Sequence, residues 1–190
     1  MSQAGALESG SLLQAKGVHY SASELLGGDP TFAAPFAGGA FATLYLAPHN
    51  YHRVHMPLAG SLRLARYIPG DLFSVNVATA EGVPGLFVRN ERIACVFDTA
   101  AGPMAVVLVG ALFVGSMSLA WAGEVRGERA RMMRDLPVRP LVALDKGAEL
   151  GWFNMGSTVI LMFAAKGPAL VPGLAPGQPL RMGEPIAMLR

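Results

Sequence analysis

IACVFDTAAGPMAVVLV, residues 93–109, consists of two apolar runs on either side of a short turn sequence. Ile93 to Phe97 and Met104 to Val109 have the length and the aliphatic content of buried strands. Asp98 to Gly102 has the composition of a turn, and two strands joined so closely pair as an antiparallel hairpin. This stretch therefore predicts that the core of the protein is built from β-strands.

Strand candidates recur along the chain, whereas helix signals are few. Phe41 to Leu46 and Thr158 to Phe163 are further apolar runs of strand length. The clearest helix is predicted at Ser21 to Gly27, where Glu24 completes a capping box with the first serine. The 23 glycines and 14 prolines fit short strands joined by turns. We expect a mainly β fold of the α+β class, with a sandwich-like core and a few short helices, in one domain over residues 1–190.

The segment between Asp98 and Glu124 contains no charged residue, and two interpretations compete for it. By length alone it is a candidate transmembrane helix. Glycines interrupt it at short intervals, however, and the pieces Met104 to Val109 and Ala111 to Val114 are short enough to be buried strands. The interruptions favour strands.

The composition excludes some classes of function. Hydrophobic residues make up 52% of the chain and charged residues 15%, so a large core, a membrane-facing surface or both are expected. The net charge of +2 is too small to indicate a nucleic-acid partner. Cys95 is the single cysteine, so the chain cannot form an internal disulfide. Its apolar neighbours predict a buried small hydrophobic residue.

One stretch is rich in arginine. Glu124 to Pro140 contains five arginines against three acidic residues. It is predicted to be a solvated loop, and a patch that meets anionic lipid head groups is the functional alternative. The glycine- and proline-rich tail from Gly167 to Gly183 is predicted to be a loop around one short strand.

Two short motifs carry candidate chemistry. In the first, His52-Arg53-Val54-His55, the histidines could be metal ligands together with His49, a proton-transfer pair, or ordinary surface residues. The second is Gly156-Ser157-Thr158, placed before an apolar strand. Taken alone, such a tripeptide is usually only a turn into a strand.

Together, and in this order, the two motifs resemble those of the phosphatidylserine decarboxylase family. The resemblance extends from about Leu12 to about Pro185, and it places the uncharged segment in the folded catalytic core rather than in a membrane helix. The other stretches that carry it are Leu13–Gly17, Pro69–Asn76, Phe87–Arg92, Phe97–Thr99, Gly102–Met104, Trp121–Gly123 and Lys146–Gly151.

The resemblance implies a proenzyme that cuts itself between Gly156 and Ser157. The products would be a β subunit of residues 1–156 and an α subunit of residues 157–190, the second beginning with a pyruvoyl group made from Ser157. This group would form a Schiff base with phosphatidylserine and release CO2 to give phosphatidylethanolamine, and no metal is expected. An electrophile of this kind supplies chemistry that protein side chains lack.

The resemblance also assigns roles to individual side chains. His55 matches the histidine of the self-cleavage relay, His52 matches the one proposed to protonate the decarboxylated intermediate, and Thr158 could orient the Ser157 hydroxyl. The implied partners are phosphatidylserine and membrane lipid, the two subunits of the cleaved chain, and a second copy in a homodimer. The implied location is the cytoplasmic face of a bacterial inner membrane, with the protein bound peripherally.

The sequence departs from the family pattern in two places. The family's relay also uses an aspartate in a Val-Asp-Gly segment upstream of the part that matches Ser2-Gln3, and the 190 residues do not include it. Either the start is internal to a longer protein, or the chain is a short form that processes slowly or not at all and serves as an unprocessed lipid-binding homologue. His49-Asn50 also replaces the usual Arg-Asp, a change expected to alter only local hydrogen bonds.

Overall fold

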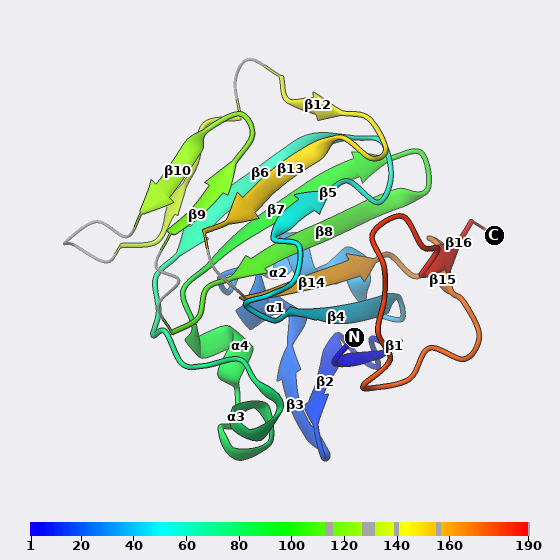
Figure 1. The fold of residues 1–190 in the computed structure, drawn as a ribbon. Helices are drawn as coiled ribbons and strands as arrows, with labels where there is room; N and C mark the ends of the chain where they lie inside the picture. The colour runs from blue at the N-terminus through cyan, green and yellow to red at the C-terminus, as the bar shows by residue number, and fades with distance from the viewer. Residues whose placement is uncertain (113–115, 127–131, 139–140, 155–156, 190) are drawn as a thin grey trace.

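The computed structural model describes residues 1–112, 116–126, 132–138, 141–154 and 157–189 (Figure 1). A large antiparallel sheet lies at the centre, a smaller sheet packs on one face, and helices and a hairpin cover the other. The mainly β, sandwich-like α+β fold predicted from the sequence is therefore confirmed.

The large sheet has the strand order β1-β4-β14-β8-β7-β6-β11, and β12 also pairs with β6. Its strands are β1 (Gln3–Ala6), β4 (Ala40–Leu46), β6 (Gly60–Ile68), β7 (Arg92–Thr99), β8 (Gly102–Val109), β11 (Arg134–Asp135), β12 (Ala143–Leu144) and β14 (Ser157–Phe163).

The small sheet has the order β10-β9-β13-β5. Its strands are β5 (Arg53–His55), β9 (Ser116–Leu119), β10 (Gly123–Arg126) and β13 (Glu149–Phe153). The remaining elements are the hairpin β2 (Ser11–Ala15) and β3 (Val18–Ser21), the helices α1 (Ala22–Leu25), α2 (Pro30–Ala33), α3 (Val77–Gly82) and α4 (Leu86–Arg89), the 3-10 turn η1 (Ala34–Phe36), and the pair β15 (Ala169–Leu170) and β16 (Ala187–Met188).

The strands β7, β8 and β14 are buried on both faces over most of their length, which explains why each contains an unbroken run of five or more apolar residues. Successive side chains point to opposite faces. On β8, for example, Val106 and Leu108 pack in the core between the two sheets, whereas Val107 and Val109 pack in the core under the helices. One run of apolar residues thus serves two separate cores.

Most of the predicted elements are present. β7 and β8 form the predicted hairpin, and the predicted strands at residues 41–46 and 158–163 are β4 and β14. Helix α1 has the predicted capping box, in which the Ser21 hydroxyl accepts from the Glu24 N–H and the Glu24 carboxylate accepts from the Ser21 N–H. The Ser21 hydroxyl also donates to the Glu24 carboxylate at 2.7 Å, and this bond, with the one from the Ser21 N–H, lowers the pKa of Glu24. Cys95 is fully buried, as predicted, and burial raises the pKa of its thiol.

The uncharged segment forms strands where the structure describes it. Across the described residues, no helix combines the length and the apolar character needed to cross a membrane. The predicted strand at Ala111 to Val114 is wrong at Ala111 and Leu112, which lie between β8 and β9, and residues 113–114 lie outside the described part. Beyond β8 the Gly110 N–H still donates to the Glu91 carbonyl at 2.8 Å, whereas the Gly110 carbonyl accepts from the Asn90 side chain at 2.9 Å instead of from a strand.

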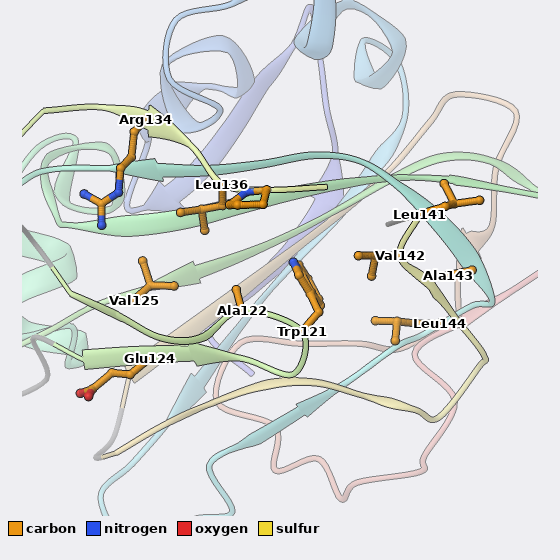
Figure 2. Close-up of a pocket in the computed structure, with 11 residues that line it drawn as sticks. Trp121, Ala122, Glu124, Val125, Arg134, Leu136, Leu141, Val142, Ala143 and Leu144 are labelled. Atoms are coloured by element: carbon orange, nitrogen blue, oxygen red, sulfur yellow. The ribbon is translucent and has the colours of Figure 1, made fainter. Parts of the chain in front are cut away.

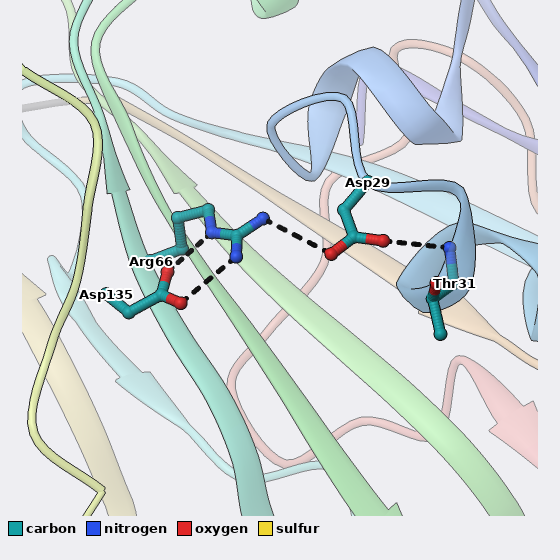
Figure 3. Close-up of polar contacts among 4 residues, drawn as sticks. All are labelled: Asp29, Thr31, Arg66 and Asp135. Carbon is teal, nitrogen blue, oxygen red and sulfur yellow. Dashed lines mark hydrogen bonds and ion pairs between the residues drawn. The ribbon is translucent and has the colours of Figure 1, made fainter.

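The arginine-rich stretch is not simply a loop. Its first residues form β10, and Arg134–Asp135 form the edge strand β11, so the loop prediction is wrong at these two strands. Figure 3 shows how Arg66 holds β11: its guanidinium donates to Asp135 at 2.6 and 3.1 Å and lies 3.9 Å from Asp29. The arginines 129, 131 and 139 lie outside the described residues. The tail contains β15, the single short strand predicted there.

Candidate functional site

Ser157 is the first residue of β14 and lies deep in the large sheet. The strand is flanked on both sides, by β4 and by β8, and Ser157 pairs with Leu46. Its side chain is fully buried, and its hydroxyl oxygen has no hydrogen-bond partner among the described residues. It shares the β14 face of Val159, which packs in the core between the sheets. Burying a hydroxyl without a hydrogen-bond partner lowers the stability of the fold, so the position of Ser157 calls for a functional explanation.

Two connections between the sheets meet beside this serine. One runs from β4 to β5 through residues 47–52, and the other runs from β13 to β14 through residues 154–156. The described ends of the two connections lie next to each other, because Leu46 pairs with Ser157 and Arg53 pairs with Trp152. The predicted cleavage position thus lies where the chain passes from the small sheet to the large one. Gly156 itself is outside the described residues.

His52 belongs to the first connection, directly before β5. Its carbonyl accepts from the Phe153 N–H at 3.0 Å, which ties it to the strand that leads to Ser157. Its ring nitrogen Nε2 is buried and has no partner among the described residues. Val54 and Met56, which follow at alternate positions, are buried in the core between the sheets. His52 therefore lies on the inner side of the small sheet, the side that faces Ser157.

His55 lies on the outer side of the same strand, and both of its ring nitrogens are engaged. Nδ1 lies 2.9 Å from the Gly147 carbonyl, and Nε2 lies 2.8 Å from the Tyr51 hydroxyl. A carbonyl can only accept, so Nδ1 carries the proton and Nε2 is the basic nitrogen that accepts from Tyr51. The two rings are also stacked, with centroids 5.8 Å apart. Sequence reasoning missed Tyr51, although it stands four residues before His55.

An ion pair fixes β5 to β13 beside these histidines. Arg53 donates to Glu149 at 2.5 Å, and this bond raises the pKa of the guanidinium. The same guanidinium lies 5.6 Å from the centre of the Trp152 ring. On the other side of the connection, Asn50 closes the turn that leads into β5: its side-chain oxygen accepts from the Ala47 N–H at 2.8 Å. Asn50, where the family usually has aspartate, thus stabilises the turn that precedes His52.

Thr158 lies on the opposite face of β14 from Ser157. It shares that face with Ile160 and Met162, which pack under the helices. Its hydroxyl is buried and has no partner among the described residues. The structure thus brings His52 and Ser157 to the same side and separates both from Thr158 and His55.

Comparisons with known proteins identify the family of the chain. The sequence model of the phosphatidylserine decarboxylase family matches residues 1–188. The chain belongs to the phosphatidylserine decarboxylase family. The proenzymes of that name from Pseudomonas aeruginosa and Azotobacter vinelandii are 55% and 56% identical to it, over 99% and 98% of its length. The one from Pseudomonas putida is 54% identical over 98%. The chain spans 66% of the length of each of these three relatives.

A metal site on His49, His52 and His55 is not supported. All three histidines lie in the described part of the chain, where no three potential ligands gather around a common point. His52 points inward, whereas both ring nitrogens of His55 are engaged on the outer side.

Proposed function

We propose that this chain is a self-cleaving phosphatidylserine decarboxylase, a carboxy-lyase, in which Ser157 is both the nucleophile of the cleavage and the source of a pyruvoyl group. The observation that carries the proposal is the pair of adjacent connections. The Ser157 hydroxyl, which has no partner among the described residues, lies on the same inner side as His52, and the described parts of the two motifs lie side by side there.

The cleavage would begin when the Ser157 hydroxyl attacks the Gly156 carbonyl. The amide bond becomes an ester, and the nitrogen of residue 157 becomes a free amine. Removal of the Ser157 Cα proton then expels the Gly156 carboxylate and leaves dehydroalanine, whose hydrolysis releases ammonia. A glycine before the serine suits the attack because it has no side chain to crowd the carbonyl. Fragment 1–156 keeps all its backbone atoms, whereas fragment 157–190 loses the nitrogen of residue 157, which a ketone oxygen from water replaces.

The fold suits a group formed at position 157. β14 pairs with β4 from Ser157 to Phe163 and with β8 from Thr158 to Phe163, and both neighbours belong to the β subunit. The α subunit would therefore remain in the sheet after the cut. A pyruvoyl group supplies the electron sink that a decarboxylation requires.

The two histidines would divide the proton transfers. The Gly147 carbonyl fixes the His55 tautomer with Nε2 as the base, which suits the self-cleavage relay. His52, on the inner side, would protonate the substrate carbon after CO2 leaves. For His55 to act on Ser157, its Nε2 must give up the Tyr51 hydroxyl and its ring must move from the outer side of the small sheet toward the inner side. Thr158 lies on the other face, so any contribution to the orientation of Ser157 would pass through the backbone.

The proposed substrate sets the location. Phosphatidylserine is a membrane lipid, so the chain would act while bound peripherally to a membrane, which we assign to the cytoplasmic face of the bacterial inner membrane. The proposed partners are the lipid itself and the two subunits of the cleaved chain. Flotation with vesicles that contain phosphatidylserine would test the association, and analytical ultracentrifugation would test the homodimer.

Mass spectrometry of the denatured, purified protein tests the proposal. We expect fragments 1–156 and 157–190, the smaller one short of its plain mass by one ammonia, and formation of phosphatidylethanolamine from phosphatidylserine. Ser157→Ala should remain one inactive chain. Ser118→Ala is the matched control, because Ser118 is another buried strand serine, 3% exposed, and this variant should be cut normally. A Ser157→Ala protein that still decarboxylates would overturn the mechanism.

A single uncut species from the unmodified chain would favour the second function, an unprocessed lipid-binding homologue. Binding of phosphatidylserine vesicles without CO2 release would then be the expected behaviour. The two functions are thus separated by one mass measurement and one product measurement.

A further inference from the structure

A pocket of about 530 Å³ opens at the β6 edge of the large sheet, away from the predicted site residues. Its walls come from the turn between β9 and β10, from β10 itself, and from residues 134, 136, 137 and 141–144. The volume falls within the roughly 300–1,000 Å³ of ordinary ligand pockets. None of Ser157, His52 and His55 lines it.

The pocket has one charged end and one apolar end. Figure 2 shows Arg134 and Glu124 at one end, leucine and valine side chains at the other, and Trp121 between them. The Arg134 guanidinium lies 4.5 Å from the centre of the buried Tyr67 ring, which fixes the position of the positive charge. The apolar end is formed by Leu141, Val142 and Leu144.

The wall that carries Arg134 is held firmly. β11 pairs with β6, and the Asp135 carboxylate receives two hydrogen bonds from Arg66, whose side chain is only 12% exposed. Fork-shaped arginine–carboxylate pairs of this kind combine strength with a fixed geometry. The charged end of the pocket is therefore built before any ligand arrives.

Large apolar side chains beside the pocket face the solvent. Leu141, on the pocket rim, is 74% exposed, and Met132, two residues before Arg134, is 68% exposed. Exposed apolar residues grouped within ten positions of the sequence indicate a surface that contacts another apolar phase. A bilayer satisfies this requirement and can also deliver a lipid to the pocket.

We propose that this pocket binds one aminophospholipid molecule. An acyl chain would lie between the apolar walls, the phosphate would accept from Arg134, and the ammonium group would donate to Glu124. A phospholipid that carries both a phosphate and an amine matches a pocket with one arginine and one glutamate at the same end. The choice of a lipid ligand rests on the proposed function, but the site is separate from Ser157.

The two tryptophans of the chain, Trp121 and Trp152, provide a direct measurement. In the uncut Ser157→Ala chain, Trp152→Phe leaves Trp121 as the only indole. The probe is a phosphatidylcholine vesicle that contains phosphatidylethanolamine with brominated acyl chains, because bromine quenches tryptophan on contact. We expect quenching relative to the same vesicle without bromine, and weaker quenching when the bromine is carried by phosphatidylcholine or phosphatidylglycerol.

Variants of the pocket sharpen the test. Ala122→Phe should fill the pocket and abolish the quenching, whereas Ala100→Phe should not, because Ala100 is an exposed alanine in the β7–β8 turn. Arg134→Gln should weaken binding of all three lipids about tenfold, equivalent to about 1.4 kcal/mol. Glu124→Gln should remove only the preference for phosphatidylethanolamine.

Equal quenching in the Ala122→Phe and Ala100→Phe variants would overturn the proposal. So would a change of oligomeric state in Ala122→Phe with unchanged quenching, which would assign the pocket to a contact between copies of the chain. Because Ser157→Ala cannot turn over lipid, these results do not depend on decarboxylation. An uncut natural chain that shows the quenching would refute the proposed function alone.

Discussion

The inner and outer sides of the small sheet place two similar histidines in different environments. On the inner side, His52 has a buried ring nitrogen without a partner among the described residues. On the outer side, three residues later, His55 is held by Tyr51 and the Gly147 carbonyl. The difference arises because alternate residues of an extended chain point to opposite sides, so a spacing of three separates side chains that the same spacing would bring together on a helix. Proximity in the sequence is therefore not proximity in the site.

The largest expected effect separates the two histidines by function. His55→Ala should slow self-cleavage by about 10²–10⁴-fold, the usual contribution of a positioned acid–base group. His52→Ala should be cut, yet form little phosphatidylethanolamine. A time course of fragment formation by denaturing mass spectrometry, followed by a decarboxylation assay on the cut protein, measures both. His49→Ala, exposed and outside the motif pair, is the control. Uncut His52→Ala with normally cut His55→Ala would exchange the two roles.

The sequence predicted the central hairpin, β4, β14 and the α1 cap because each depends on a local pattern of apolar, turn or capping residues. It also predicted the two site motifs, but only through their resemblance to a family. It could not show that the motifs meet where two connections cross between sheets, because that depends on strand pairings more than ninety residues apart, such as Arg53 with Trp152. Nor could it show which core each of Ser157 and Thr158 faces, because that depends on how β14 is oriented between the small sheet and the helices.

The next effect tests whether the inner side is a packed core. Met56 is 2% exposed and lies between the sheets. Met56→Ala should lower the free energy of unfolding by about 2–5 kcal/mol, since buried apolar atoms are removed and a cavity remains. Denaturant titration of the uncut Ser157→Ala chain measures the change without interference from cleavage. Met182→Ala is the matched control, because Met182 is 62% exposed and the same truncation there should change little. Equal changes in the two variants would contradict the assignment of inner and outer sides.

A smaller effect is expected at the outer histidine. The Tyr51 hydroxyl occupies His55 Nε2, the nitrogen that must accept a proton during cleavage. Tyr51→Phe keeps the stacked ring but removes this hydrogen bond, whose net contribution of about 0.5–1.5 kcal/mol corresponds to roughly a twofold to tenfold change in rate. We expect faster cleavage, measured by the same mass-spectrometric time course. Slower cleavage would show that the hydroxyl positions the ring for catalysis instead of restraining it.

The smallest effect is expected at the ion pair on the outer side. Arg53 and Glu149 lie 2.5 Å apart, but their side chains are 54% and 28% exposed, so water and salt weaken their attraction. Arg53→Gln should shift the denaturation midpoint by a small fraction of the Met56→Ala shift, and the difference should shrink further at high salt. Glu149→Gln removes the other partner and should behave alike. A large, salt-independent shift in either variant would mean that the outer side holds β5 against β13 as strongly as the inner core does. The contrast between the two sides would then apply to the histidines alone and not to the sheet that carries them.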